Sequence, residues 1–481
     1  MRHVGTTIAA LAVAAALTLS GCAGQATDTT TETTEPEAIE QVEEVVEEES
    51  AVEAEETSDE TAPETFSLTR DDLTITETIT DDANESHAIT ADGTSDSYEG
   101  VEVTKTGDAD GDEADFYGTN AAVFATNGAT LDITGSIVST DGVHANAVFS
   151  YGEGTVLNIT RSIIETTNNC SGGIMVTGGG TLNATDLYIH TMGNSSAAIR
   201  SDRGGGTENV TGGSYQTDGT GSPVIYSTAD VTVKDATLVS TASQGVVVEG
   251  QNSVALVDCD LTASNTTKNS DKSDYYQAVM IYQSMSGDAA EGEAFFSMEG
   301  GSLTNANGDI FFVNNTVCTI SLTGASIVNE DAEGVLLRAA AAGWGSEGSN
   351  GGHVTLNLDS EDLAGDIVVD SVSELNMYLA GGTAYEGAIN AANEGAVYVE
   401  IESGSTWTLT ADSYVTSLTC DAGAIDLNGH TLYVDGVAYT EGTASTGSAI
   451  EFTLPTGGGM GGPGMGEPPE GGPGGEPPAR P

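Results

Sequence analysis

Short apolar stretches recur along the chain in one fixed pattern. An apolar residue is followed at +2 and +7 by further apolar residues, and a small or polar residue stands at +4. Nine copies follow one another, most at steps of about 23–26 residues. They start at Leu131, Leu157, Leu182, Val231, Val254, Phe296, Ile320 and Leu356, with a degenerate copy at Val210 and Tyr215. Their +4 residues are Gly135, Arg161, Asp186, Gly212, Asp235, Asp258, Gly300, Gly324 and Ser360.

This periodicity predicts a solenoid. Residues two apart lie on one face of a strand, and Gly or Asp then turns the chain toward the next strand. A second short apolar strand precedes each copy, as at Val148-Phe149 and Val246–Val248. A β-sandwich also has many short strands, but it does not hold a near-constant period over more than about two hundred residues. We therefore expect an all-β fold, a right-handed parallel β-helix.

Composition and charge agree with an extended, surface-rich protein. The chain of 481 residues has 62 Gly and 2 Trp, with 74 acidic and 11 basic residues and a formal net charge of −63. Long-range repulsion disfavours unassisted binding to nucleic acid or to an anionic membrane. Partners should be neutral, cationic or bridged by a divalent metal.

The N-terminus has the pattern of a lipoprotein signal. Arg2 and His3 precede an apolar stretch from Ile8 to Leu17, which is too short to span a bilayer, and Leu19-Ser20-Gly21-Cys22 follows. The tetrapeptide resembles the bacterial lipobox, which implies cleavage before Cys22 and a lipid on its sulfur. An ordinary secretory signal with an incidental cysteine is the alternative. From position 25 to 65 there are sixteen acidic residues and no Lys or Arg, which favours a disordered stalk.

The C-terminal end has a different organisation. Three short apolar stretches, joined at Asn428-Gly429 and Asp435-Gly436, predict a β-meander that covers the last coil. We expect a signal peptide over 1–21, the lipidated stalk over 22–65, an N-terminal cap and first turn over 66–120, the β-helix over 121–370, the last turns and meander cap over 371–455, and a Gly/Pro-rich disordered tail over 456–481. Cys170, Cys259, Cys318 and Cys420 show no metal or redox spacing, and we expect buried free thiols.

Departures from the repeat suggest where function lies. The step from Val254 to Phe296 is 42 residues and that from Ile320 to Leu356 is 36, so loops are inserted over 264–277, 284–294 and 339–353. The last two leave the same corner of the coil two turns apart, about 10 Å from each other. Insertions on one side of a solenoid commonly build its binding face.

The inserted loops hold an unusual set of aromatic and basic side chains. An exposed aromatic platform flanked by carboxylates suits a sugar, whose C–H faces stack on rings while its hydroxyls bond to acids and amides. The alternative is that these aromatic residues only fix the loops onto the coil. The predicted glycan-binding residues are Tyr275, Tyr276, Tyr282, Arg338 and Trp344.

An acidic run is the second candidate site. Asp108, Asp110, Asp112 and Asp115 offer oxygen ligands that suit calcium, the one cofactor that we consider, but their spacing is not that of an EF-hand. A solvated acidic loop is the alternative. A polysaccharide lyase would need a Lys or Arg base beside carboxylates or calcium. Its candidates are scattered at Arg161, Arg200, Arg203, Lys234 and Arg338, with Asp202 next to two of them.

Several stretches together resemble a known group of proteins. They are the lipobox, the acidic stalk, the β-helix repeats, and the segments Ala278–Asp288, Leu336–Gly345 and Leu427–Leu432. The similarity is to adhesin-like surface lipoproteins of anaerobic gut bacteria and, more distantly, to pectate-lyase-like carbohydrate-binding β-helices. It implies the β-helix fold far more firmly than an activity. From the lipobox and the loop residues we expect a monomeric protein on the extracellular face of the cell membrane, held there by its lipid alone, that binds polysaccharide or host glycan without catalysis. A calcium-assisted polysaccharide lyase and a structural surface spacer are the alternatives.

Overall fold

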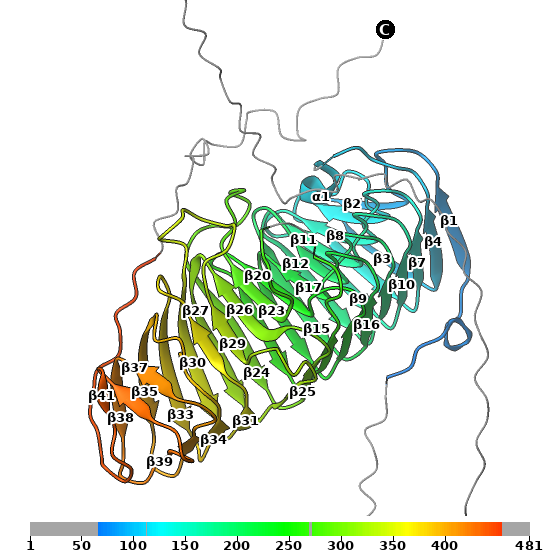
Figure 1. Cartoon of the computed structure of the whole chain (residues 1–481). Coiled ribbons are helices and arrows are strands. Elements are labelled where there is room, and N and C mark those ends of the chain that lie inside the picture. The colour runs from blue at the N-terminus through cyan, green and yellow to red at the C-terminus, as the bar shows by residue number, and fades with distance from the viewer. Residues whose placement is uncertain (1–65, 112, 269–271, 455–481) are drawn as a thin grey trace, which may run out of the picture. The chain divides into compact units, whose positions relative to one another are not determined.

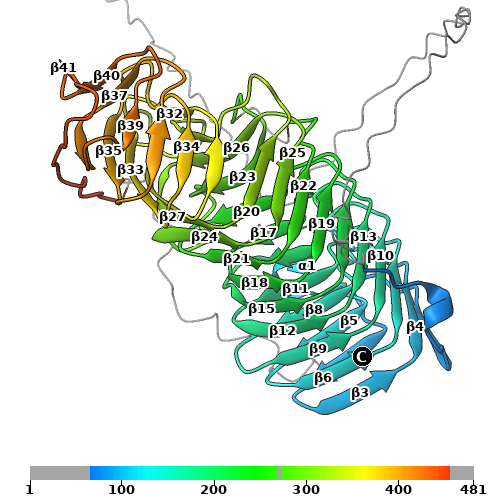
Figure 2. The ribbon, with the colours of Figure 1, turned by 90° about the horizontal axis from the view of Figure 1, so that it is seen from below.

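The protein forms a parallel β-helix. The computed structural model describes residues 66–454 except 112 and 269–271. Strands of successive coils pair in parallel and in chain order, so that the coils stack from β1 to β40 (Figure 1). In the view from below, the strands β3, β6, β9, β12, β15, β18 and β21 follow one another in a row (Figure 2). The predicted all-β solenoid is confirmed.

Three long sheets form the walls of the coil. Sheet A contains β1 (Glu77–Asp81), β4 (Val101–Lys105), β7 (Ile137–Thr140), β10 (Ile163–Thr166), β13 (Tyr188–Thr191), β16 (Ser214–Thr217), β19 (Thr237–Ser240), β22 (Asp260–Ala263), β25 (Ser302–Asn305) and β28 (Ser326–Asn329). Sheet B contains β2 (Ile89–Asp92), β5 (Val123–Thr126), β8 (Val148–Tyr151), β11 (Ile174–Thr177), β14 (Ile199–Ser201), β17 (Ile225–Ser227), β20 (Val246–Glu249), β23 (Gln277–Tyr282), β26 (Asp309–Asn314), β29 (Leu337–Ala339) and β32 (Ile367–Val369).

The third wall and two smaller sheets complete the coil. Sheet C contains β3 (Ser95–Glu99), β6 (Thr130–Thr134), β9 (Val156–Thr160), β12 (Gly180–Thr185), β15 (Gly206–Thr211), β18 (Asp230–Lys234), β21 (Ser253–Val257), β24 (Glu293–Glu299), β27 (Thr316–Thr323), β30 (Gly352–Asp359), β33 (Glu374–Ala380), β35 (Ala396–Ile401) and β38 (Ser417–Cys420). Sheet D contains β31 (Asp362–Ala364), β34 (Ala384–Glu386), β36 (Thr406–Thr408) and β39 (Ile425–Asp426), and sheet E contains β37 (Ser413–Val415), β40 (Leu432–Val434) and β41 (Val437–Ala438).

Helices are short. A 3-10 turn, η1 (Arg70–Asp72), precedes the first coil, and α1 (Glu113–Tyr117) lies in the connection from sheet A to sheet B. In the described part of the chain, no helical segment has the length and apolar character needed to cross a bilayer.

The repeat found in the sequence sets the register. Leu131, Leu157 and Leu182 are paired neighbours in sheet C, and the column continues across both insertions, where Val254 pairs with Phe296 and Ile320 with Leu356. Their side chains are buried in one continuous core. All nine +4 residues have a positive φ, from 47° at Arg161 to 68° at Gly212, which is the left-handed turn that the pattern predicts.

The degenerate copy places a carboxyl group in that core. Glu208 pairs with Leu182 on one side and Val231 on the other, so it occupies the column that apolar residues fill elsewhere. Its side chain is 0% exposed, and neither carboxyl oxygen has a hydrogen-bond partner among the described residues. Burial raises the pKa of Glu208 well above its ordinary value.

Coils are also present on both sides of 121–370, where a first turn and the last turns are predicted. Parallel pairing already begins at β1 with β4, and it continues to β37 with β40. The end is covered by the antiparallel β40–β41 hairpin, whose Asp435 and Gly436 both have positive φ, as a tight hairpin turn requires. At Asn428-Gly429 the chain passes from sheet D to sheet E, so β39 still belongs to the coil.

Candidate functional site

A column of apolar side chains covers part of the outer face of sheet B. Tyr226, Val247, Met280 and Phe312 are register partners in consecutive strands, and they form a hydrophobic cluster separate from the core. All six residues of β23 and all six of β26 are buried, so these strands have both faces covered. Something other than the coil must therefore shield this face.

The inserted loops supply that cover. Residues 264–276 connect sheet A to sheet B, and residues 283–292 and 340–351 both connect sheet B to sheet C. The prediction that the last two leave the same corner is confirmed. Trp344 packs edge-on against Tyr282, with ring centres 5.1 Å apart, and Tyr275 packs against Phe312 at 5.6 Å.

Between the loops lies a pocket of about 90 Å³. This is well below the roughly 300–1,000 Å³ of typical ligand sites, so it suits part of one sugar residue rather than a run of them. It is lined by Gly221, Pro223, Tyr226, Gln244, Val247, Asn265, Lys268, Ser273, Tyr275, Tyr276, Gln277, Met280, Tyr282 and Trp344.

The five predicted glycan-binding residues come together here. Tyr275, Tyr276, Tyr282 and Trp344 line the pocket, and the Arg338 guanidinium lies 4.2 Å from the centre of the Tyr275 ring. The expected exposed platform is wrong in one respect. Trp344 and Tyr282 are each only 5% exposed, because the loops fold inward over the apolar column, and Tyr275, at 37%, is the more accessible ring.

Two buried polar atoms in the pocket lining have no protein partner. The side-chain oxygen of Gln277 and the indole nitrogen of Trp344 make no hydrogen bond within the described part of the chain. Both side chains are nearly fully buried. An unpaired buried donor or acceptor costs roughly 1–3 kcal/mol, so a ligand with hydroxyl groups would find one acceptor and one donor ready.

A buried carboxyl lies behind the tyrosines. The hydroxyls of Tyr226 and Tyr282 donate to Oε2 of Glu249, at 2.5 and 2.9 Å. Burial raises the pKa of Glu249, and it also raises the pKa of both tyrosines. The tyrosines therefore keep their protons at neutral pH, so neither is suited to act as a base.

A network of charged side chains, buried except for Arg203, lies next to the pocket on the same face, since Arg200 is the register partner of Tyr226. Arg200 contacts Asp115 at 3.3 Å and Asp202 at 3.2 Å. Arg203 contacts Asp288 at 2.5 Å, and its guanidinium lies 3.9 Å from the ring centre of Phe116 in α1. Arg203 thus joins the α1 segment to the loop over 283–292.

This network brings together only part of the proposed lyase set. Arg200, Arg203 and Asp202 are neighbours, whereas Arg161 stands at an exposed corner and Lys234 is exposed on β18 of sheet C. Arg338 is paired with Asp309 at 2.6 Å.

The network predicts a pH dependence of stability. Burial raises the pKa of Asp202 from 3.8 to about 7, although Arg200 partly opposes this. The folded protein therefore holds this proton to a higher pH than the unfolded chain, and stability is lost as pH rises from about 4 to about 7. Asp202→Asn should remove this dependence, whose size is of the order of 4 kcal/mol. Urea unfolding of the parent and the variant at pH 5 and pH 8 measures this dependence. An equal change in the free energy of unfolding between the two pH values in both proteins would contradict the prediction.

The acidic run does not converge on one point. Asp108 and Asp110 are exposed, Asp115 is buried on α1, and Asp112 lies outside the described residues. Asp108 accepts a hydrogen bond from the backbone of Val143, whereas Asp115 contacts His144 at 3.0 Å. Calcium binding by this run stays a prediction.

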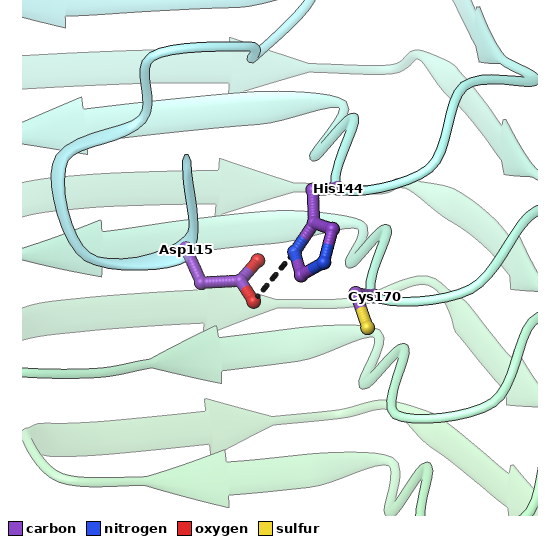
Figure 3. Close-up of side chains that lie close together, drawn as sticks. All are labelled: Asp115, His144 and Cys170. Atoms are coloured by element: carbon purple, nitrogen blue, oxygen red, sulfur yellow. Dashed lines mark hydrogen bonds and ion pairs between the residues drawn. The ribbon is translucent and has the colours of Figure 1, made fainter. Parts of the chain in front are cut away.

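Asp115, His144 and Cys170 form a compact group in which one ligand atom of each lies within 4.8 Å of the others (Figure 3). Such a group has the residue types of a metal site. Cys170 is disulfide-bonded, however, and Asp115 is already paired with Arg200. The sulfur is thus not a thiolate ligand here.

The expectation of a free thiol is wrong for Cys170, because its pairing leaves no signal in local spacing, and is confirmed for Cys259, Cys318 and Cys420.

Several pocket residues carry no signal in the repeat. Tyr226 and Gln244 lie on preceding coils, and Asn265 and Gln277 lie at the two ends of the predicted inserted loop 264–277, but the sequence prediction named none of the four as a site residue. One signal was present. The stretch Gln277–Tyr282 does not alternate between apolar and polar residues, which indicates a strand that is covered on both faces.

The fold and the pocket define the class: a parallel β-helix whose inserted loops build an aromatic pocket on one outer face. No protein-family model, no curated protein and no solved structure matches this chain. The resemblance to surface lipoproteins therefore stays a prediction, and Cys22, on which the lipid anchor depends, lies outside the described residues.

Proposed function

We propose that this protein is an adhesin-like surface protein that binds polysaccharide or host glycan in the pocket bordered by the inserted loops. The observation that carries the proposal is the set of residues that line this pocket. Aromatic rings stand beside amide and hydroxyl groups, and two buried polar atoms in it lack a protein partner among the described residues. Aromatic faces contact the C–H surface of a sugar, while amides and hydroxyls bond to its hydroxyl groups.

Tyr275 is the residue with which to test the pocket. It is the most exposed of the rings, so its removal leaves the buried cluster of Trp344, Tyr282 and Phe312 in place. Tyr275→Ala should weaken glycan binding about tenfold through loss of ring contact. The full chain and the variant would be compared on a polysaccharide and mucin-glycan array.

Tyr414→Ala is the matched control. Tyr414 is half-buried on β37, stacked on Tyr433 and outside the pocket lining. The control should bind as the parent does. If Tyr275→Ala also binds every glycan like the parent, the pocket is not the binding site.

The same array distinguishes the alternatives. Binding that is lost in chelator would support a role for calcium, and absence of binding to every glycan would favour a structural surface spacer.

One observation favours a polysaccharide lyase. The ammonium group of Lys272 lies 5.7 Å from the ring centre of Trp344, and burial lowers the pKa of Lys272, as a catalytic base requires. Release of unsaturated sugar that disappears in Lys272→Gln would establish that activity.

A further inference from the structure

The pocket has a local charge opposite to that of the whole protein. The chain has 74 acidic and 11 basic residues, yet the described lining of the pocket contains Lys268 and no Asp or Glu. Two of the other basic residues lie at its edge. Lys272 lies over Trp344, and Arg338 lies over Tyr275. Glu249, which accepts hydrogen bonds from the lining residues Tyr226 and Tyr282, has a pKa raised by burial.

This distribution excludes some ligands and favours one. A site for a cation would present carboxylates, which are abundant elsewhere on this chain but absent from the described lining. An anion would be repelled at long range by a net charge of −63 and would bind only where cations gather. Arg338 is largely neutralised by Asp309 at 2.6 Å. Lys268 pairs with Asp274 at 3.3 Å, but that carboxylate is 95% exposed, so the pairing is weak.

We propose, resting on the glycan-binding function above, that the pocket selects a sugar with an anionic substituent, a carboxylate or a sulfate, at the end of a glycan, and that Lys268 is the residue that recognises this charge. The small volume of the pocket suits one terminal residue. The aromatic rings hold the ring of the sugar, and the Lys268 ammonium group donates to the anionic oxygens.

The test compares matched pairs of sugars with the full chain. Probes are 3′-sialyllactose against lactose, and galactose 6-sulfate against galactose, which distinguish carboxylate from sulfate. The anionic member of at least one pair should bind about tenfold tighter at low salt, and the preference should shrink at high salt. Lys268→Gln should remove this preference, so that the two members of each pair bind alike.

Two further variants serve as controls for the charge of Lys268. Lys234→Gln removes the same unit of charge from sheet C, away from the pocket, and should change nothing. Asp274→Asn removes the anion that competes for Lys268 and should tighten binding of the anionic sugar. If both members of each pair bind the parent equally, and both lose binding in Tyr275→Ala, the charge selection is wrong and the glycan-binding function still holds. If no glycan binds, both the charge selection and the glycan-binding function are wrong.

Discussion

Replacing Glu208 with leucine is expected to raise the free energy of unfolding at pH 7 by about 2–4 kcal/mol. Glu208 stands in a column whose neighbours are Leu182 and Val231, and its carboxyl group has no partner among the described residues. Burying an unpaired polar group costs about 1–3 kcal/mol, and a leucine side chain adds apolar burial in the same space.

The gain in the free energy of unfolding from Glu208→Leu should depend on pH. The folded-state pKa of Glu208 is raised above its ordinary value of 4.5, so folding binds a proton at pH values above that point. The parent therefore loses stability as pH rises above about 4.5, and the advantage of Glu208→Leu should grow with it. Thermal and urea unfolding at pH 4 and pH 8 measure this difference.

Glu208→Gln is the control for charge alone. It removes the titration of Glu208 but keeps an unpaired polar group in the core. It should therefore remove only the part of the pH dependence that Glu208 contributes, leave the part from Asp202, and give only part of the gain at pH 7. A leucine variant that is less stable than the parent at pH 8 would show that the carboxyl group has a partner or a role that the described residues do not reveal.

Arg200→Met is expected to have the largest destabilising effect, about 3–5 kcal/mol. The methionine preserves most of the packing of the arginine stem but removes the charge that Asp115 and Asp202 share. Asp115, whose pKa Arg200 lowers, would then remain buried without this counter-charge, which is the costly way to break a buried ion pair, whereas Asp202, whose pKa is already about 7, would take up a proton. The midpoint of thermal unfolding should fall accordingly.

The reason for that loss can be tested by restoring neutrality. Adding Asp115→Asn and Asp202→Asn to Arg200→Met should recover much of the lost stability, since the isolated buried charges are gone. Arg161→Met, at an exposed corner, is the control and should change stability by no more than about 0.5 kcal/mol. An unchanged unfolding midpoint in Arg200→Met would mean that water reaches these carboxylates.

The coil itself could be predicted from the sequence because its signals are local. A polar or small residue at +4, even Arg161 or Ser360, marks the left-handed turn that each coil needs. The apolar residues at +2 and +7 then define which side chains face the core. The interruptions of 42 and 36 residues also gave the position of the inserted loops correctly.

The surroundings of the site could not be predicted, because they depend on contacts between distant segments. Asp115 and Arg200 are 85 residues apart, as are Arg203 and Asp288, and the repeat gives no reason to pair them. The sequence left two roles open for Trp344, an exposed platform or a contact that fixes its loop, and the ring is in fact buried against the apolar outer face of sheet B. The disulfide of Cys170 left no spacing signal either.

The register of sheet C is unchanged on both sides of the long insertions, where Val254 still pairs with Phe296 and Ile320 with Leu356. The register of the coil therefore does not depend on the length of these loops, although the loops still cover the apolar outer face of sheet B. Under the proposed function, the loops that border the pocket can vary while the register of the core stays constant. Chains with the same coil but other loops would be expected to keep this register and to differ in what covers the outer face of sheet B.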